Sequence, residues 1–203
     1  MAYPKHALLL STLALALTSC SRQADTPAPQ EPAPQAILVS DAKGQISLPK
    51  GFDRWPTLGS WATASGGPGT PVDEMHTVYV SPGGIETFRK DGVFADGTVL
   101  VKEVRGAKAA QLTTGNAHWA GATKVWFVMV KDSTGKHKDN PLWREGWGWA
   151  LFEADNPGKQ VAPSFEASCQ TCHEPAKGSD WIYSAAYPVL HDGTPPKAAW
   201  DPN

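Results

Sequence analysis

The clearest pattern along the chain is a set of short stretches rich in β-branched and aromatic residues. Such residues suit the pleated surface of a sheet, where successive side chains point to opposite faces. Residues 124–131 (KVWFVMVK) are apolar on both faces and are predicted to form a central strand. In the stretch Gly146–Phe152, Trp147, Trp149 and Leu151 share one face. Strands are therefore predicted over residues 77–80, 98–104, 124–131 and 146–152.

Helical patterns are short. Ser81-Pro82 supplies an N-cap and a first helical residue, which predicts a helix to about Lys90 that ends at Gly92. A second short helix is predicted over residues 163–174. Together these elements predict one α+β domain over residues 37–203, predominantly an antiparallel sheet with a few short helices.

The N-terminus has a different character. A basic start and an apolar run from Ala7 to Leu17 predict a signal peptide over residues 1–19. The residues Leu17-Thr-Ser-Cys20 resemble a bacterial lipobox, which implies a lipid on Cys20. Residues 20–36, rich in Pro, Ala and Gln, are predicted to form a disordered tether. We expect an exported lipoprotein at the periplasmic face of the outer membrane, or in the periplasm. The alternative is an ordinary signal peptide that leaves Cys20 free.

The composition of the chain limits the classes of binding partner that can be expected. Without Lys5, the exported chain has 17 basic and 20 acidic residues and no basic stripe, so nucleic acid is not an expected partner. Beyond the signal peptide, no apolar stretch is long enough to span a membrane, so membrane contact is expected only through Cys20. The chain has three cysteines, too few for a disulfide framework once Cys20 carries a lipid.

The chemistry concentrates in Cys169-Gln-Thr-Cys172-His173. Cys-x-x-Cys-His is the attachment signature of c-type haem: the thiols of Cys169 and Cys172 form thioethers, and His173 binds the iron. A structural zinc site would need a second ligand pair, and the chain has no second Cys pair. A thioredoxin-like redox pair would need a βαβ setting, which the pattern lacks. Covalent haem c is therefore the predicted cofactor.

The sequence shows no obvious residue to serve as the second axial ligand of that iron. Electron-transfer cytochromes of the common helical type use a Met after the motif, and no Met follows His173. Met129 lies in an apolar strand, where a core role is expected. The other histidines are expected to be surface or hydrogen-bonded residues: His76, His118, His137 and His191. The sequence thus favours an open or labile iron that binds a small molecule.

An ordered set of segments resembles the cytochrome P-460 family, which includes the cytochromes c′-beta. The resemblance covers roughly residues 50–185. Its segments are Trp61, 76–82 (HTVYVSP), 94–104 (FADGTVLVKEV), 125–132 (VWFVMVKD), 146–149 (GWGW), the motif at 169–173 and 179–181 (SDW). It implies a mostly antiparallel β domain, often a homodimer, with His173 proximal and a pocket on the other haem face.

Two activities occur in that family, and the resemblance leaves both open. One group oxidises hydroxylamine and carries a Lys joined to the haem; Lys102 is the matching position here. The active members also place a carboxylate shortly before the motif. Glu166 is near that position, although Ser164 aligns closer. The other group binds nitric oxide or carbon monoxide under a Phe cap, for which Phe94 and Phe88 are candidates.

We therefore expect hydroxylamine or a related small nitrogen compound to be oxidised, with an exported electron-transfer protein as a candidate partner. Capture of a diatomic gas without turnover is the alternative. A simple electron carrier ranks third, since it needs a sixth ligand.

Overall fold

The computed structural model describes residues 39–67, 69–193 and 197, all of which lie in the compact unit Pro34–Asn203. The predicted signal peptide (1–19) and the predicted lipid site with its tether (20–36) lie outside the described residues. Among the residues described, no helix is long and apolar enough to cross a membrane.

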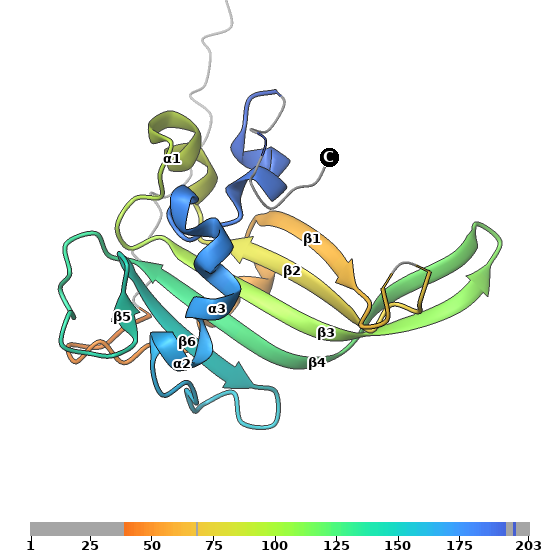
Figure 1. Cartoon of the computed structure of the whole chain (residues 1–203), viewed down its shortest axis with the longest axis horizontal. Helices are drawn as coiled ribbons and strands as arrows, with labels where there is room; N and C mark the ends of the chain where they lie inside the picture. Colours follow the sequence, from red (N-terminus) through yellow and green to blue (C-terminus); the bar gives the residue numbers. More distant parts are fainter. Residues whose placement is uncertain (1–38, 68, 194–196, 198–203) are drawn as a thin grey trace, which may run out of the picture. The chain divides into compact units, whose positions relative to one another are not determined.

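A six-stranded antiparallel sheet forms the framework, with strand order β1-β2-β3-β4-β6-β5 (Figure 1). The predicted α+β class is confirmed. The strands are β1 (Thr57–Thr63), β2 (Glu74–Val80), β3 (Val99–Leu112), β4 (Gly115–Lys131), β5 (Trp143–Arg144) and β6 (Trp147–Glu153). The α-helices are α1 (Gly84–Asp91), α2 (Phe165–Ser168) and α3 (Gln170–His173). Four 3₁₀ turns accompany them: η1 (Phe52–Arg54), η2 (Glu174–Ser179), η3 (Ser184–Ala186) and η4 (Pro188–Leu190).

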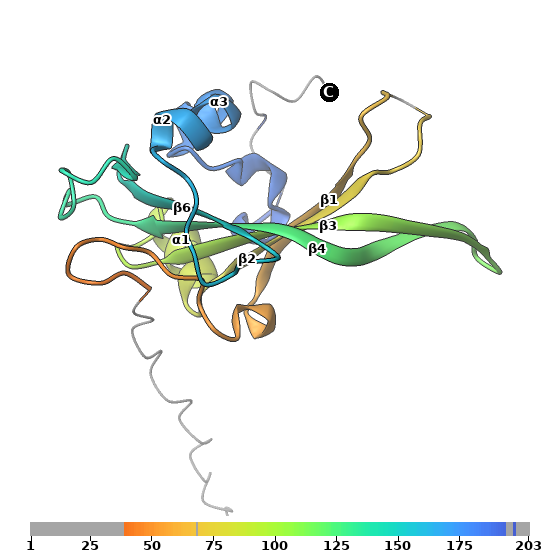
Figure 2. The ribbon, with the colours of Figure 1, turned by 90° about the horizontal axis from the view of Figure 1, so that it is seen from below.

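The sheet is covered on both faces. Helices α2 and α3 lie over one face, and the segment that contains η1 lies over the other (Figure 2). Alternation along β3 separates the two cores: Leu100 faces the first, while Val99 and Val101 face the second. The first core also contains Trp147, Trp149, Phe165 and Trp181; it is the one that borders the haem motif.

The hairpin of β3 and β4 is much longer than the sequence pattern predicts. The pairing continues from Arg105↔Thr123 to Leu112↔Gly115, well beyond the predicted strand end at residue 104. Most side chains from Lys108 to Ala120 are exposed, so this part has no buried face and gives no alternating apolar signal. Backbone pairing across the hairpin makes these residues strands.

Both predicted helices differ in detail from the structure. Helix α1 begins at Gly84, not next to Ser81, because the buried Ser81 hydroxyl accepts a hydrogen bond from Val99 N (3.0 Å) and is used to join β2 to β3. It ends at Gly92 in the left-handed conformation (φ 74°), as predicted. The second helix is interrupted at Cys169, whose backbone (φ −126°) separates α2 from α3.

Candidate haem site

The haem motif lies on α3 and the residues beside it, across from the sheet. Ser164 caps α2 by accepting a hydrogen bond from Ala167 N (3.2 Å), and Phe165 anchors that helix in the core between Trp149 and Trp181. The cap and this anchor hold the start of the motif against the sheet. Cys169 is consequently buried, whereas Cys172 lies at the surface.

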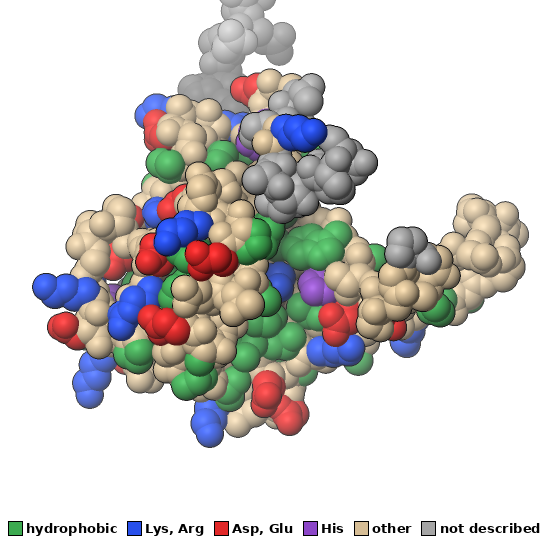
Figure 3. Space-filling view, viewed as in Figure 1, with side chains coloured by type: hydrophobic (Ala, Val, Ile, Leu, Met, Phe, Trp, Pro, Cys, Tyr) green, Lys and Arg blue, Asp and Glu red, His purple; other side chains and the backbone are tan. Residues whose placement is uncertain are grey.

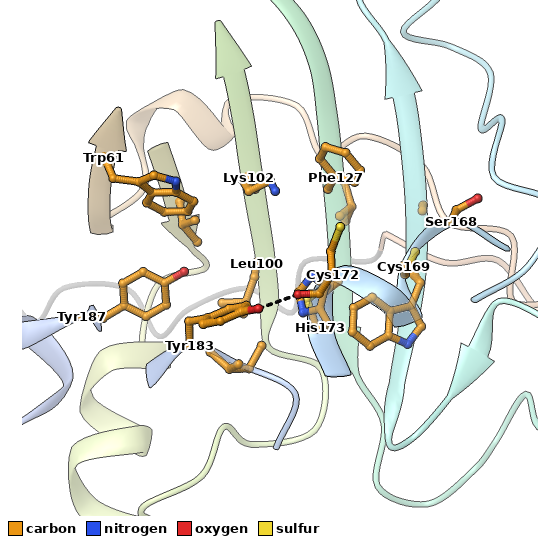
Figure 4. Close-up of a pocket in the computed structure, with 16 residues that line it drawn as sticks. Trp61, Leu100, Lys102, Phe127, Ser168, Cys169, Cys172, His173, Tyr183 and Tyr187 are labelled. Atoms are coloured by element: carbon orange, nitrogen blue, oxygen red, sulfur yellow. Dashed lines mark hydrogen bonds between the residues drawn. The ribbon is translucent and has the colours of Figure 1, made fainter. Parts of the chain in front are cut away.

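A pocket with about 890 Å³ of empty space, part of it open to solvent, separates the motif from the sheet (Figure 4). Five strands supply one wall, with Trp61, Val78, Leu100, Lys102, Phe127, Val128, Met129, Trp149 and Ala150. The motif and the following turns supply the other, with Ser168, Cys169, Cys172, His173, Ile182, Tyr183 and Tyr187. On this face of the molecule, apolar side chains gather over the middle strands beside α3 (Figure 3).

His173 has the arrangement of a metal ligand. Its Nδ1 donates a hydrogen bond to the carbonyl of Trp181 (2.7 Å), which leaves Nε2 as the free lone pair. The ring also packs edge-on against Trp149, with centroids 4.8 Å apart. Burial lowers the pKa of His173, against the opposing effect of the Trp181 carbonyl, so the imidazole favours its neutral form.

The two cysteines fit thioether attachment. Both line the pocket, and burial, with a smaller effect of Cys172, raises the pKa of the Cys169 thiol to about 12. Burial disfavours the charged thiolate. A thioether does not ionise, so Cys169 can be buried in the attached form without this penalty. Among the residues that the structure describes, no three His, Cys, Asp or Glu side chains are gathered as a metal ion would require.

Lys102 is brought into the same pocket. From β3 its side chain points toward the side that holds Phe127 and Cys172 (Figure 4), and Nζ lies 4.5 Å from the centre of the Phe127 ring. Burial lowers the pKa of the Lys102 ammonium, while Cys172 and Glu74 act weakly in the other direction. The pocket therefore contains an amine that gives up its proton more easily than a surface lysine does.

Two other candidates from the sequence are not brought to the pocket. Glu166 is exposed on α2 and pairs with Arg144 (Nε–Oε1 3.4 Å), because the turn that buries Phe165 directs the next side chain outward. Phe94 is buried in the core between Phe88 (centroids 4.8 Å apart) and Trp147 (6.0 Å), and neither Phe lines the pocket.

The apolar lining instead includes aromatic residues that the sequence did not single out as pocket residues. Phe127 is the cross-strand partner of Lys102, and Trp61 is on β1, which was not predicted. Tyr183 donates a hydrogen bond to the carbonyl of Cys172, and Tyr187 is buried. Only the register of the sheet reveals the first two; the short distance from the motif could have indicated the tyrosines.

An apolar pocket between a sheet and a Cys-x-x-Cys-His helix, with the imidazole oriented by a backbone carbonyl, defines a haem protein. The chain belongs to the cytochrome P460 family, whose family model matches residues 49–184, and this confirms the resemblance read from the sequence. Membership implies a haem cofactor. A comparison with curated proteins finds no match for the chain.

Proposed function

We propose that this protein holds haem c through thioether bonds from Cys169 and Cys172, with His173 on the iron, and that it oxidises hydroxylamine or a related small nitrogen compound. The observation that carries the proposal is Lys102. Its amine lies in an apolar pocket with the haem motif, and burial lowers its pKa. This is the position at which the hydroxylamine-oxidising members of the family carry their haem-linked lysine.

Each part of the pocket has a role in this reaction. When bound, haem would supply a one-electron redox centre, with an external one-electron acceptor as the final oxidant. The aromatic lining, which includes Trp61, Phe127 and Tyr187, gives the pocket an apolar wall. His173, fixed by the Trp181 carbonyl, holds the proximal position. Protons leave the substrate together with the electrons and need a base.

Capture of nitric oxide or carbon monoxide without turnover is the second candidate. The described lining contains no carboxylate, and Glu166 lies outside the pocket, so the distal acid of the hydroxylamine oxidisers has no counterpart there. A simple electron carrier would need a sixth ligand, and the Lys102 amine or the Met129 thioether of the lining are the donors at hand.

Turnover and linkage of the purified haem protein separate these functions. We expect hydroxylamine to reduce a one-electron acceptor such as ferricyanide in the presence of the wild-type protein. Lys102→Met should lower this rate at least about tenfold, equivalent to about 1.4 kcal/mol. Lys108→Met, an exposed lysine on the same strand, should not. Mass spectrometry of a digest should show the Lys102 peptide joined to the haem peptide of residues 169–173.

Two results would contradict the enzyme. An unlinked Lys102, with no turnover by a wild-type protein that still binds nitric oxide, establishes the gas binder. No turnover and no gas binding, with low-spin haem, leaves the electron carrier.

We also propose that the protein is an exported lipoprotein. The apolar run Ala7–Leu17 and the lipobox-like residues before Cys20 support it. This location would give the haem domain access to exported electron-transfer proteins, which could accept the electrons removed from the substrate.

A further inference from the structure

A buried histidine lies beside the pocket, on the strand face that forms its wall. His76 is 9% exposed and occupies the same face of β2 as Val78, which lines the pocket. In the register of the sheet, Val78 is paired with Lys102, and His76 with Trp61 on the other side. The Trp61 ring stacks on the imidazole, with centroids 5.2 Å apart and planes inclined by 27°. His76 thus stacks on one residue of the pocket lining, Trp61, and shares a strand face with another, Val78.

The hydrogen bonds of His76 leave one nitrogen free. Nε2 lies 3.2 Å from Glu74 Oε2 and 3.4 Å from Thr63 Oγ1, whereas Nδ1 is buried and has no hydrogen-bond partner among the described residues. Because a carboxylate can only accept, this network places the proton on Nε2 and the lone pair on Nδ1. A buried hydrogen-bond acceptor without a donor destabilises the fold by about 1–3 kcal/mol. This cost is removed when a ligand donates a hydrogen bond or a proton to the acceptor.

The other nitrogen, Nε2, is connected to solvent through Glu74. Glu74 also accepts a hydrogen bond from Lys124 Nζ (2.9 Å), and their side chains are 31% and 52% exposed. A proton on Nε2 is therefore one hydrogen bond from a carboxylate that water can reach.

We propose that His76 is the proton acceptor of the pocket: Nδ1 takes the proton that a bound weak acid releases, and Nε2 passes its own proton to Glu74 and so to solvent. The proposal rests on the haem site of the proposed function and supplies the base that its chemistry requires. It also accounts for a pocket whose described lining has no carboxylate. The transfer leaves His76 neutral with the proton on Nδ1, and return of the Nε2 tautomer by exchange with solvent completes the cycle.

The charges around His76 favour its neutral form. Burial lowers the pKa of His76, Lys102 on β3 and Lys124 on β4 act in the same direction, and Glu74 on β2 opposes them. Trp61, on β1, carries no charge. The imidazole is a free base at neutral pH and becomes protonated as the pH falls through its lowered pKa. Any process that needs the base should therefore slow in acid.

Cyanide binding to the ferric haem protein tests this without reference to turnover. Hydrogen cyanide enters as a neutral acid and binds iron as the anion, so a base that accepts its proton accelerates association. Stopped-flow association rates should fall about 10²-fold in His76→Gln, as expected for a lost general base. Carbon monoxide, which has no proton to release, should bind the ferrous variant within about twofold of wild type. His118→Gln, the same substitution at an exposed histidine, should leave both rates unchanged.

A second variant tests the route through Glu74, which accepts the Nε2 proton in this proposal and whose charge raises the pKa of His76. Glu74→Gln removes the charge that raises the pKa of His76, so the low-pH decline of the cyanide rate should move to lower pH. If His76→Gln fails to load haem, this displacement decides the question.

Wild-type cyanide rates in His76→Gln, or an unmoved pH profile in Glu74→Gln, would overturn the inference while leaving the haem site intact. A wild-type protein with no covalent haem would instead refute the proposed function itself.

Discussion

At the scale of single residues, His173 decides what the site is. Its Nδ1 is occupied by the Trp181 carbonyl, and its ring is held by Trp149, so the lone pair of Nε2 has one fixed direction. A hydrogen bond from the ring nitrogen that does not bind the metal fixes the tautomer of a metal-binding histidine and increases its basicity. In the proposed site the cysteines would hold the haem, and His173 would set the electronic state of its iron.

Replacing His173 with Ala should separate attachment from ligation. Haem should stay covalently bound, because Cys169 and Cys172 remain, and the absorption spectrum should change, because the iron loses its proximal nitrogen. Intact-mass measurement reports the first effect and visible spectroscopy the second. His191→Ala is a suitable control, since His191 Nε2 donates a hydrogen bond to the Ser184 carbonyl (2.9 Å) and His191 is not in the pocket lining. A variant with the wild-type spectrum would refute the proximal assignment.

At the scale of elements, a strained turn connects β4 to the haem ligand. Asp180 (φ 58°) and Trp181 (φ 63°) are consecutive left-handed residues other than glycine, a conformation that costs roughly 1–2 kcal/mol each. Lys131, at the end of β4, pairs with Asp180 (Nζ–Oδ1 2.9 Å), and Trp147 Nε1 donates to the Asp180 carbonyl (3.0 Å). These contacts present the Trp181 carbonyl to His173.

Asp180→Asn should therefore destabilise the fold and disturb the proximal ligand. Loss of one partner from a buried pair typically costs about 3–5 kcal/mol. The Asp180 side chain is 30% exposed and that of Lys131 9%. Because Asp180 is partly exposed, we expect a loss below this range, about 2–3 kcal/mol, in the free energy of unfolding by denaturant. Resonance Raman spectroscopy should also show a shifted iron–histidine vibration.

Asp91→Asn is the matched control, because the exposed pair of Asp91 with Lys90 (4.0 Å) should contribute less than about 1 kcal/mol. Equal losses in the two variants, or an unchanged vibration in Asp180→Asn, would contradict the role of this turn.

The sequence predicts the elements that are buried and misses those that are not. Val99, Val101 and Val128 are almost fully buried, and burial on both faces produced the apolar runs from which β3 and β4 were predicted. Strand β1 has one buried residue, Leu58, so it shows no alternation. The outer hairpin depends on backbone pairing and has no core of its own.

The candidate site also has a part that the sequence predicts and a part that it does not. Cys169, Cys172 and His173 form a local motif that can be read directly, and Lys102 could be assigned to a strand face by alternation. The pocket wall joins residues of five strands, and its membership depends on register, which local patterns leave open. Glu166 shows the limit: its distance from the motif suggested the pocket, but the rotation of one helical turn directs it outward.

At the scale of the whole molecule, the two faces of the sheet have different roles. One face packs against the segment with η1 and forms a closed core, while the other combines a core with the haem pocket. The closed core stabilises the sheet independently of the cofactor. We accordingly expect the domain to depend on the N-terminal residues for location and not for haem chemistry.

Cys20→Ser should release the protein from membranes. The lipid needs the Cys20 thiol, so the variant should move from the membrane fraction to the soluble exported fraction, and labelled fatty acid should no longer be incorporated. Its visible spectrum should match that of wild type. Membrane association that persists in Cys20→Ser would contradict the lipoprotein proposal.

The central claim is a haem held by His173 whose other side is open to a small ligand. Its most direct test is the spin and coordination state of the purified wild-type protein, measured by absorption and resonance Raman spectroscopy in both oxidation states. We predict five-coordinate, high-spin ferrous haem that binds carbon monoxide and nitric oxide. A low-spin, six-coordinate spectrum in both oxidation states would contradict the claim and identify the protein as an electron carrier.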